Sequence, residues 1–351
     1  MAASDSSGLS DLPAPDSVVI TGAAGWLGKN FVRAVAGNRK QVRCLVQNAD
    51  ERALLEVAGS SVEVVVGDVR DPSALDRLFD DVAGATVFHA AGVIHPQSAV
   101  RELFDVNVGG TELVLDQARR ANAGRFIHVS SNSPFGANPT PSHVFTEDSP
   151  YNPYMGYGKS KFEAEQLVKR ASDRGDLETV IVRAPWFYGP HQPDRQTQWF
   201  RAVARGRFPM LGDGTQRRSM VYTENLVDGM LRAEVAGAAP GRAYWIADAE
   251  PYEMRSILGT VRDALSAEGV SVTERTPRIP LFAGVIAEHV DGFLQGRGRY
   301  MQAMHVLGEL KDTIACDITR AREELGYEPK MALLEGMRTS IRWCIERGEQ
   351  F

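Results

Sequence analysis

The sequence has 351 residues, of which 43% are hydrophobic and 24% charged, and this composition and length are typical of a globular protein with two lobes. The net charge of −6 argues against nucleic acid as the main partner, because nucleic acids bind basic faces. Three scattered cysteines, no apolar run of roughly 18 residues and no secretory signal indicate a cytoplasmic protein without disulfides or membrane spans.

Residues 1–16 are rich in Ala, Ser, Asp and Pro and are expected to form a flexible tail. After them, short β-rich apolar runs alternate with helical patterns, which is typical of a parallel sheet with right-handed crossovers. Strands are expected at Val18–Thr21, Gln41–Val46, Val62–Gly67, Thr86–His89, Phe126–Val129 and Thr179–Arg183. The helices between them are expected at Leu27–Ala36, Ala53–Val57, Ser73–Phe79, Ala99–Arg120 and Tyr154–Arg170.

The alternation of strand and helix breaks after Arg183, where several prolines mark a long loop. An amphipathic stretch follows much later at Phe282–Leu294, and a terminal helix is expected at Leu333–Glu346. We therefore expect an α/β fold in which residues 17–185 form a doubly wound parallel sheet of the Rossmann type. Residues 186–351 are expected to form mostly a smaller mixed α/β substrate lobe, from which strands can return to the main sheet.

A glycine triplet with the spacing G-x-x-G-x-x-G lies between the first expected strand and the first expected helix, at Gly22, Gly25 and Gly28. Missing side chains let a pyrophosphate approach the backbone, and the helix N-terminus offers it unpaired N–H groups and a positive dipole end. Glycine-rich turns are common, but the strand, turn and helix in this order predict a dinucleotide site.

Tyr157 and Lys161 are four residues apart in an expected helix, so they lie on one face, one turn apart. Because a nearby cation favours the phenolate, Lys161 is expected to lower the pKa of the tyrosine, which can then move the proton that accompanies hydride transfer. Ser131 follows the strand at Phe126–Val129 and can hold a substrate oxygen at the carboxyl edge of the sheet. Taken alone, the Tyr–Lys spacing can be a chance match, and serines in turns commonly satisfy backbone groups.

Further short motifs follow one another along the chain. They are Gly67-Asp68-Val69-Arg70-Asp71, Val87-Phe88-His89-Ala90-Ala91, Asn107-Val108-Gly109-Gly110-Thr111, Tyr157-Gly158-Lys159-Ser160-Lys161, Tyr188-Gly189-Pro190, Gly212-Asp213-Gly214 and Leu325-Gly326-Tyr327. With the glycine triplet and Ser131, this set resembles the extended short-chain dehydrogenase/reductase superfamily, in its NAD-dependent epimerase/dehydratase branch, over nearly the whole chain.

This resemblance implies an enzyme whose catalytic residues are Ser131, Tyr157 and Lys161. It also implies a cofactor site, for which the expected residues are Gly22, Ala24, Gly25, Trp26, Leu27, Gly28, Gln47, Asp68, Val69, Ala90, Ala91, Gly92, Asn107, Tyr157 and Lys161. Relatives often pair through two helices, here Ala99–Arg120 and Tyr154–Arg170, so a homodimer is expected.

The expected substrate-binding residues are His95, Ser131, Asn132, Trp186 and Arg218. In relatives that act on nucleotide-linked sugars, an asparagine usually stands in place of Trp186, and an indole cannot replace it because it has one donor and no acceptor. Arg218 matches an arginine that the family sets against a substrate phosphate. Equally open are a core role for Trp186 and, for Arg218, a surface ion pair or a carboxylate partner such as Glu224.

Other polar side chains lie on loops that should face the cleft, and an ordinary solvated role is the simpler interpretation for each of them. They are His95, Gln97, His143, His191 and Arg195. No cluster of His, Cys, Asp or Glu has the spacing of metal ligands, so no metal site is expected.

The second expected strand ends in Leu45-Val46-Gln47-Asn48, without the acidic residue of NAD-specific relatives or the arginine of NADP-specific ones. Because a 2′-phosphate needs a cation, and Gln47 or Asn48 can hydrogen-bond a plain ribose, NAD is favoured slightly over NADP. The basic side chains of Lys40, Arg43 or Arg52 would reverse this preference if they reached the ribose.

Three functions are compatible with the sequence. The first is an NAD(P)-dependent oxidoreductase or epimerase that acts on a secondary alcohol or ketone of a small molecule, first of all a nucleotide sugar through a 4-keto intermediate. The second is a reductase or dehydrogenase of a lipophilic, sterol- or flavonoid-like ketone or alcohol, which Trp186 and the apolar Phe282–Leu294 favour. The third is a dinucleotide-binding regulator without turnover, against which the intact Ser131, Tyr157 and Lys161 argue.

Overall fold

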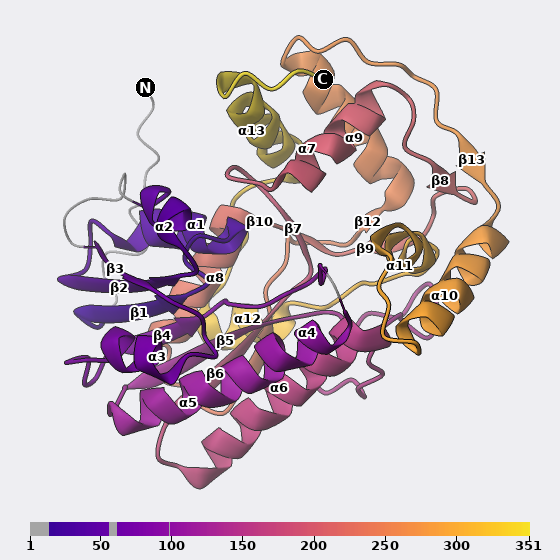
Figure 1. Cartoon of the computed structure of the whole chain (residues 1–351). Helices are drawn as coiled ribbons and strands as arrows, with labels where there is room; N and C mark the ends of the chain where they lie inside the picture. Colours follow the sequence, from indigo (N-terminus) through magenta and orange to yellow (C-terminus); the bar gives the residue numbers. More distant parts are fainter. Residues whose placement is uncertain (1–13, 56–61, 98) are drawn as a thin grey trace.

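A computed structural model describes residues 14–55, 62–97 and 99–351 of the chain. Its centre is a parallel sheet of seven strands in the order β11-β6-β5-β4-β1-β2-β3 (Figure 1). The strands are β1 (Ser17–Thr21), β2 (Gln41–Val46), β3 (Val62–Val66), β4 (Thr86–His89), β5 (Arg125–Ser131), β6 (Glu178–Ala184) and β11 (Ala243–Trp245). The expected doubly wound α/β fold is confirmed.

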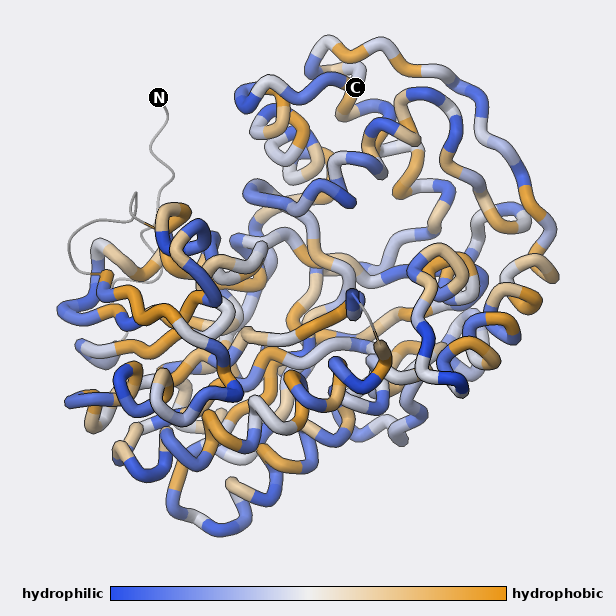
Figure 2. Tube along the Cα trace, in the orientation of Figure 1, coloured by the Kyte–Doolittle hydropathy of each residue, from blue (hydrophilic) through white to orange (hydrophobic). Residues whose placement is uncertain are grey.

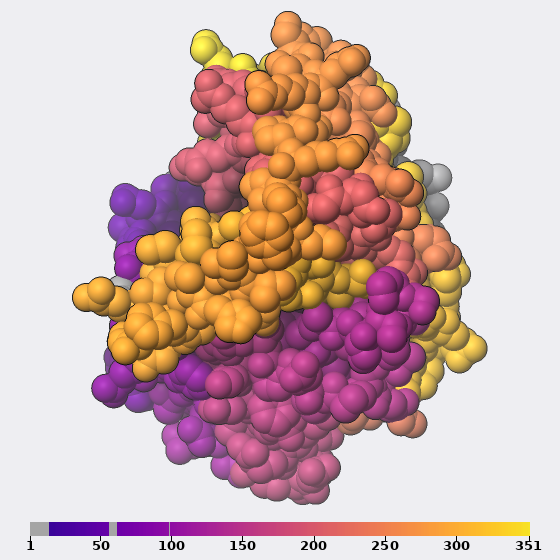
Figure 3. Space-filling view, turned by 90° about the vertical axis from the view of Figure 1, so that its right-hand side faces the viewer, coloured from indigo at the N-terminus to yellow at the C-terminus, as the bar shows by residue number. Residues whose placement is uncertain are grey.

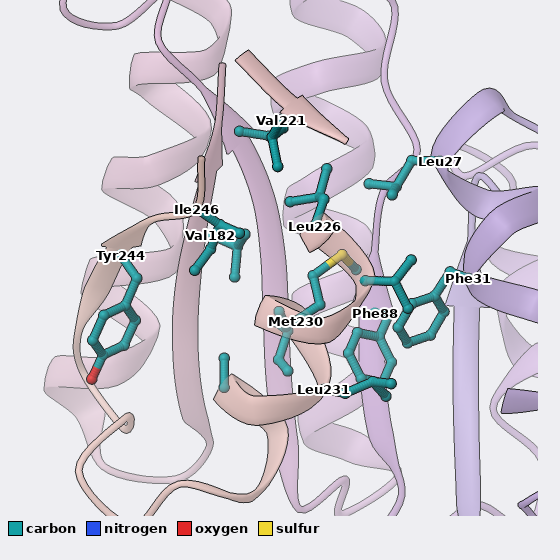
Figure 4. Close-up of a cluster of buried hydrophobic side chains, with 14 of the residues drawn as sticks. Leu27, Phe31, Phe88, Val182, Val221, Leu226, Met230, Leu231, Tyr244 and Ile246 are labelled. Atoms are coloured by element: carbon teal, nitrogen blue, oxygen red, sulfur yellow. The ribbon is translucent and has the colours of Figure 1, made fainter. Parts of the chain in front are cut away.

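Helices cover both faces of this sheet. One layer contains α1 (Trp26–Val35), α8 (Thr223–Val235) and α12 (Thr319–Leu325), and the other contains α3 (Pro72–Leu78), α5 (Thr111–Arg120) and α6 (Met155–Arg174). In the first layer, Leu27 and Phe31 of α1 meet Phe88 of β4 and Met230 of α8 (Figure 4). The central strands β1, β4 and β6 are buried on both faces, which explains why their sequences are nearly continuous apolar runs.

Two expected helices differ from the observed ones. The helix expected at Ala53–Val57 is α2 (Ala49–Ala53), because the Asn48 side chain caps its first turn by accepting from the backbone N–H of Glu51 at 2.9 Å. Residues 56 and 57 lie outside the described residues. The stretch Ala99–Arg120 contains α4 (Arg101–Phe104), a π-helical turn η2 (Asp105–Gly110) and α5 rather than one continuous helix.

The second half of the chain builds a smaller lobe around its own apolar cluster. Its helices are α7 (Asp194–Ala204), α9 (Met254–Ala267), α10 (Leu281–Gln295), α11 (Gln302–Glu309) and α13 (Leu333–Glu346). Three pairs of short strands join them: β7 (Trp186–Tyr188) with β10 (Met220–Tyr222), β9 (Arg217–Arg218) with β12 (Tyr252–Glu253), and β8 (Met210–Leu211) with β13 (Arg278–Ile279). Between these elements, α8 and β11 return to the main sheet, where β11 pairs with β6. In the described parts of the chain, no helix has the length and apolar character of a membrane span.

Candidate active site

A cavity of about 840 Å³ lies where the carboxyl ends of the main strands face the smaller lobe. Both halves of the chain line it, from the glycine turn after β1 to α11 in the second lobe. The sequence-predicted residues on its wall are Gly22, Ala24, Gly25, Trp26, Leu27, Gly28, Gln47, Ala90, Ala91, Gly92, His95, Ser131, Asn132, Tyr157, Lys161, Trp186 and Arg218. Their roles toward a ligand stay predictions, but the fold brings them to one place.

The turn between β1 and α1 has the shape that a dinucleotide requires. Gly22 has φ +72°, and a Cβ there would lie 2.6 Å from the backbone nitrogen of Ala91. A Cβ on Gly28 would lie 2.1 Å from the carbonyl oxygen of Gly22, so this glycine lets the helix approach the strand. Gly25 is the N-cap of α1 and provides no side-chain cap, which leaves the first N–H groups of the helix for an anionic ligand.

A carboxylate from α2, that of Glu51, lies next to the end of β2, although it is not part of the strand motif. Glu51 accepts a hydrogen bond from the backbone N–H of Gln47 at 2.7 Å, so its negative charge lies beside the cavity wall. Two of the three basic side chains that could bind a 2′-phosphate have other partners, since Arg43 pairs with Glu63 and Lys40 pairs with Asp16. Arg52 is exposed on α2.

Three expected cofactor residues lie outside this cavity wall. Asp68 forms a two-pronged ion pair with Arg70, at 2.8 and 2.7 Å, which lowers the pKa of its carboxyl. Val69 is buried. Asn107 accepts from the N–H of Val93 at 2.7 Å, and its amide donates to the Val93 carbonyl and to Ser160, both at 2.9 Å. It therefore fixes the loop after β4 against α6.

Ser131, at the end of β5, and Tyr157, in the first turn of α6, both line the cavity. Burial raises the pKa of the Tyr157 phenol, and the hydroxyl of Ser131 acts in the opposite direction, as does the positive charge of Arg195 on α7. The carboxylate of Glu309 raises the pKa further, so the phenol is the favoured form in the free site, and the Ser131 hydroxyl and the guanidinium of Arg195 only reduce this preference.

Lys161 is turned toward the sheet. Its ammonium donates to the carbonyl oxygen of Val129 at 2.8 Å and lies 3.2 Å from Nε2 of His128. Burial lowers its pKa from 10.5 to about 8. The ammonium is thus bonded to β5 rather than to the phenol, and the expected effect of Lys161 on the pKa of Tyr157 stays a prediction.

Two buried histidines, which the sequence analysis did not weigh, lie behind the lysine. His89 on β4 is hydrogen-bonded to Thr21 at 2.7 Å and to Thr111 at 2.9 Å, and its ring stacks on His128 at 5.4 Å. Burial lowers the pKa of His89 to about 3 and that of His128 well below its usual value, so both are neutral beside the ammonium. The two histidines are adjacent because His89 and His128 occupy the same register position in the pairing of β4 with β5.

The second lobe gives the cavity an aromatic wall and one buried cation. Trp186 is half-buried, and its ring packs on that of Trp199 at 5.0 Å. Arg218 is only 7% exposed, donates to the backbone carbonyl of Glu309, and leaves its Nε without a partner among the described residues. The alternative of a surface pair, or of a bond to Glu224, is therefore wrong.

The loop residues separate into two groups. Gln97, His191 and Arg195 line the cavity with His95, whereas His143 is bonded to Asn138 at 3.0 Å away from its wall. His95 is 2.5 Å from the Tyr300 hydroxyl, and burial lowers its pKa to about 4, so it is neutral near pH 7.

The fold and this site define a class of dinucleotide-binding α/β proteins with a Ser-Tyr-Lys constellation. The family model for the NAD dependent epimerase/dehydratase family matches residues 18–247. The chain belongs to this family and is an enzyme of it.

Similar proteins differ in what they act on. Protein y4nL of Sinorhizobium fredii is 42% identical, over 95% of this chain and 96% of that one. A 4-hydroxy-2-methyl-3-oxo-4-farnesyl-3,4-dihydroquinoline-1-oxide ketoreductase of Stigmatella aurantiaca is 30% identical, over 91% and 93%. The solved structure of DesIV, a dTDP-glucose 4,6-dehydratase of Streptomyces venezuelae with NAD and TYD bound, is 23% identical with a TM-score of 0.72, over 95% and 98%. This last likeness shows the fold alone.

Proposed function

We propose that the protein catalyses the NAD-dependent interconversion of a secondary alcohol and the corresponding ketone on a lipophilic skeleton. The observation that carries the proposal is the aromatic wall of the cavity, where Trp186 stands in place of an asparagine that could reach a substrate pyrophosphate. The ketoreductase of Stigmatella aurantiaca, whose name describes a farnesylated ring ketone, supports this substrate class by analogy.

The residues of the site fit the cofactor. The glycine turn and the uncapped start of α1 would hold the pyrophosphate, and Gln47 would face the adenosine ribose. The negative charge of Glu51 beside Gln47 disfavours a 2′-phosphate, so we assign NAD rather than NADP. When bound, the nicotinamide supplies or accepts the hydride at its C4 carbon.

The protein residues handle the proton that accompanies this hydride. In the reducing direction, Ser131 donates a hydrogen bond to the substrate carbonyl oxygen, and Tyr157 transfers its phenolic proton to that oxygen as the alcohol forms. The positive charge of Arg195 favours the resulting phenolate. Lys161 holds a positive charge beneath the site, bonded to the Val129 carbonyl.

The proposed reaction makes fewer demands on this wall than a dehydration would. Elimination of water requires a base for the carbon-bound proton and an acid for the leaving hydroxyl, in addition to the group that serves hydride transfer. Ser131 is followed by Asn132 and Ser133, and the acidic side chains on the described cavity wall are Glu102 and Glu309. A simple dehydrogenase or reductase needs neither of them.

A nucleotide sugar is the second candidate substrate, and one observation favours it. Arg218 is a buried residue of the cavity wall whose Nε has no partner among the described residues, and a phosphate oxygen is a ligand that a guanidinium can bind. The lipophilic substrate is preferred because the wall around Arg218 offers aromatic rings and the site lacks the asparagine.

A substrate panel tests the proposal. Purified protein with NADH is incubated with alkyl-chain ketones, polycyclic ketones and nucleotide 4-keto sugars, and NADH oxidation and the products are followed. We expect turnover of lipophilic ketones in the wild type and also in Arg218→Ala. Turnover of the nucleotide sugars alone, abolished in Arg218→Ala, would overturn the substrate class while leaving the hydride chemistry in place.

A further inference from the structure

Helix α10 has its large apolar side chains on the outside. Leu281, Phe282, Val285, Ile286, Val290 and Phe293 are all exposed, with values that reach 64% for Phe282, 57% for Ile286 and 58% for Phe293. We call these six residues the α10 outer face. They lie one, three or four residues apart, which places them on one side of the helix, and Figure 2 shows hydrophobic residues recurring along this segment.

The inner side of the same helix consists of small or polar residues that hold it in place. A Cβ on Gly284 would lie 2.8 Å from the side chain of Lys311, and Ala287 is buried. Asp291 is fully buried and accepts hydrogen bonds from His305 at 2.9 Å and Gln295 at 2.8 Å. Because this side is closely packed on α11, the helix cannot rotate its outer face inward.

The charges around the outer face are positive. Arg278 precedes the helix, and Arg297 and Arg299 follow it; all three are exposed. The guanidinium of Arg297 lies 3.6 Å above the ring of Phe293. The carboxylates of the helix do not offset this charge, because Glu288 pairs with Lys311 and Asp291 is buried. The chain as a whole carries a net charge of −6, so this cationic border is local.

An apolar stripe bordered by arginines matches a lipid surface with negative head groups. We propose that the α10 outer face binds the surface of a bilayer that contains anionic lipid. A second copy of the chain fits less well, since a two-fold contact would bring the three arginines of each copy together without acidic partners. The segment 275–305 crosses one face of the molecule, and no other described residues cover it in that view (Figure 3).

The α10 outer face adjoins the cavity. The inference that substrate enters from the bilayer rests on the proposed lipophilic substrate. Directly after α10, Tyr300 is bonded to His95 of the cavity wall, Met301 is exposed, and Gln302 is both exposed and part of the wall. A protein seated on α10 would therefore take an apolar substrate from the lipid phase beside the cavity rim rather than from water.

Vesicle flotation tests the inference with the full chain, without cofactor or substrate. Vesicles of phosphatidylcholine alone, or mixed with phosphatidylglycerol, are floated with wild type, with Phe282→Ser/Ile286→Ser/Phe293→Ser, and with Arg297→Glu/Arg299→Glu. We expect the wild type to float with anionic vesicles at low salt, and each variant to lose roughly ten-fold or more of the bound fraction. Added salt should weaken binding of the wild type.

Two controls make the result decisive. Leu54→Ser/Ile345→Ser removes two exposed apolar side chains elsewhere and should float like the wild type. NADH affinity and the melting temperature confirm that the variants are folded. Equal flotation of the wild type and the triple variant, or no flotation of the wild type, would overturn the inference; a dimer that the triple variant converts to monomers would assign the face to a second copy. Vesicle binding together with turnover of nucleotide sugars alone would refute only the proposed substrate.

Discussion

The Lys161 ammonium donates to the Val129 carbonyl at 2.8 Å, while Tyr157, one turn earlier on α6, lines the cavity together with Ser131. The three residues therefore have different surroundings. All three line the cavity, and Lys161 also places a buried charge between the helix and the sheet.

Tyr157→Phe should keep NADH binding and lose turnover by about 100-fold or more, the scale of a positioned acid or base. The reason is that the phenol is the group that faces the Ser131 hydroxyl on the cavity wall. Steady-state rates with an identified ketone and a fluorescence titration with NADH measure the two effects. Tyr154→Phe is the matched control, since the buried Tyr154 hydroxyl has no partner in the described structure, and it should leave the rate near that of the wild type. A Tyr157→Phe enzyme of normal rate would contradict the assignment.

Lys161→Met should abolish turnover and raise the melting temperature near pH 7. Burial lowers the pKa of Lys161 from 10.5 to about 8, so at pH 7 the folded state holds an ammonium that the unfolded state accommodates better. The shift corresponds to roughly 3 kcal/mol of destabilisation, part of which the variant recovers.

The pH dependence of the melting-temperature difference between Lys161→Met and wild type follows from the same pKa shift. Between about pH 8 and 10.5 the unfolded state binds more protons at this residue, so the wild type gains stability as the pH rises. The gap in melting temperature between Lys161→Met and wild type should therefore be largest below pH 8 and shrink above it. Calorimetry across this range measures the gap, and a constant or widening gap would disprove the buried-charge interpretation.

Gly25→Ala should fold normally and lose NADH binding. A Cβ at this position lies 3.1 Å from the carbonyl oxygen of Gly22 and otherwise points toward the cavity, where the pyrophosphate is expected. Gly37→Ala serves as the control, because a Cβ there meets nothing within 4 Å. The test is isothermal titration with NADH, alongside melting temperatures of both variants. NADH affinity equal to that of the wild type would place the pyrophosphate elsewhere.

Glu51→Gln should narrow the preference for NADH over NADPH. The Glu51 carboxylate accepts from the N–H of Gln47 at 2.7 Å, so its charge repels a 2′-phosphate at the end of β2. We expect affinity for NADPH to rise by several-fold and affinity for NADH to change little. Glu63→Gln, which removes a carboxylate paired with Arg43 on the neighbouring strand, should leave the ratio unchanged. An unaltered ratio in Glu51→Gln would remove this carboxylate from cofactor choice.

The main sheet was predictable because its central strands are buried on both faces and are largely apolar, while β2 and β3 toward the edge keep enough apolar residues to be recognised. The position of α2 was also available, since Asn48 and Glu51 have the spacing of a capping pair, but the apolar pattern drew the expected helix toward residues 53–57. The helix α7 was missed although Trp199, Phe200 and Val203 have helical spacing, because the preceding prolines indicated a long loop.

The positions of Trp186 and Arg218 on the cavity wall could not be predicted from the local sequence pattern. It depends on β7 pairing with β10 and β9 pairing with β12, contacts between segments that are more than 30 residues apart. The direction of the Lys161 side chain likewise depends on a carbonyl of another strand. The expected homodimer through the helices around α5 and α6 stays a prediction.

The return of β11 to the edge of the main sheet has a thermodynamic consequence. The chain leaves the sheet after β6, re-enters it with α8 and β11, leaves again, and packs α12 on α8 before ending in α13. Residues 17–185 without α8 would expose Phe31, Phe88 and the rest of that apolar layer to water. The first lobe therefore depends on α8 and β11, which the second half of the chain supplies, and we expect heat to melt the two lobes together.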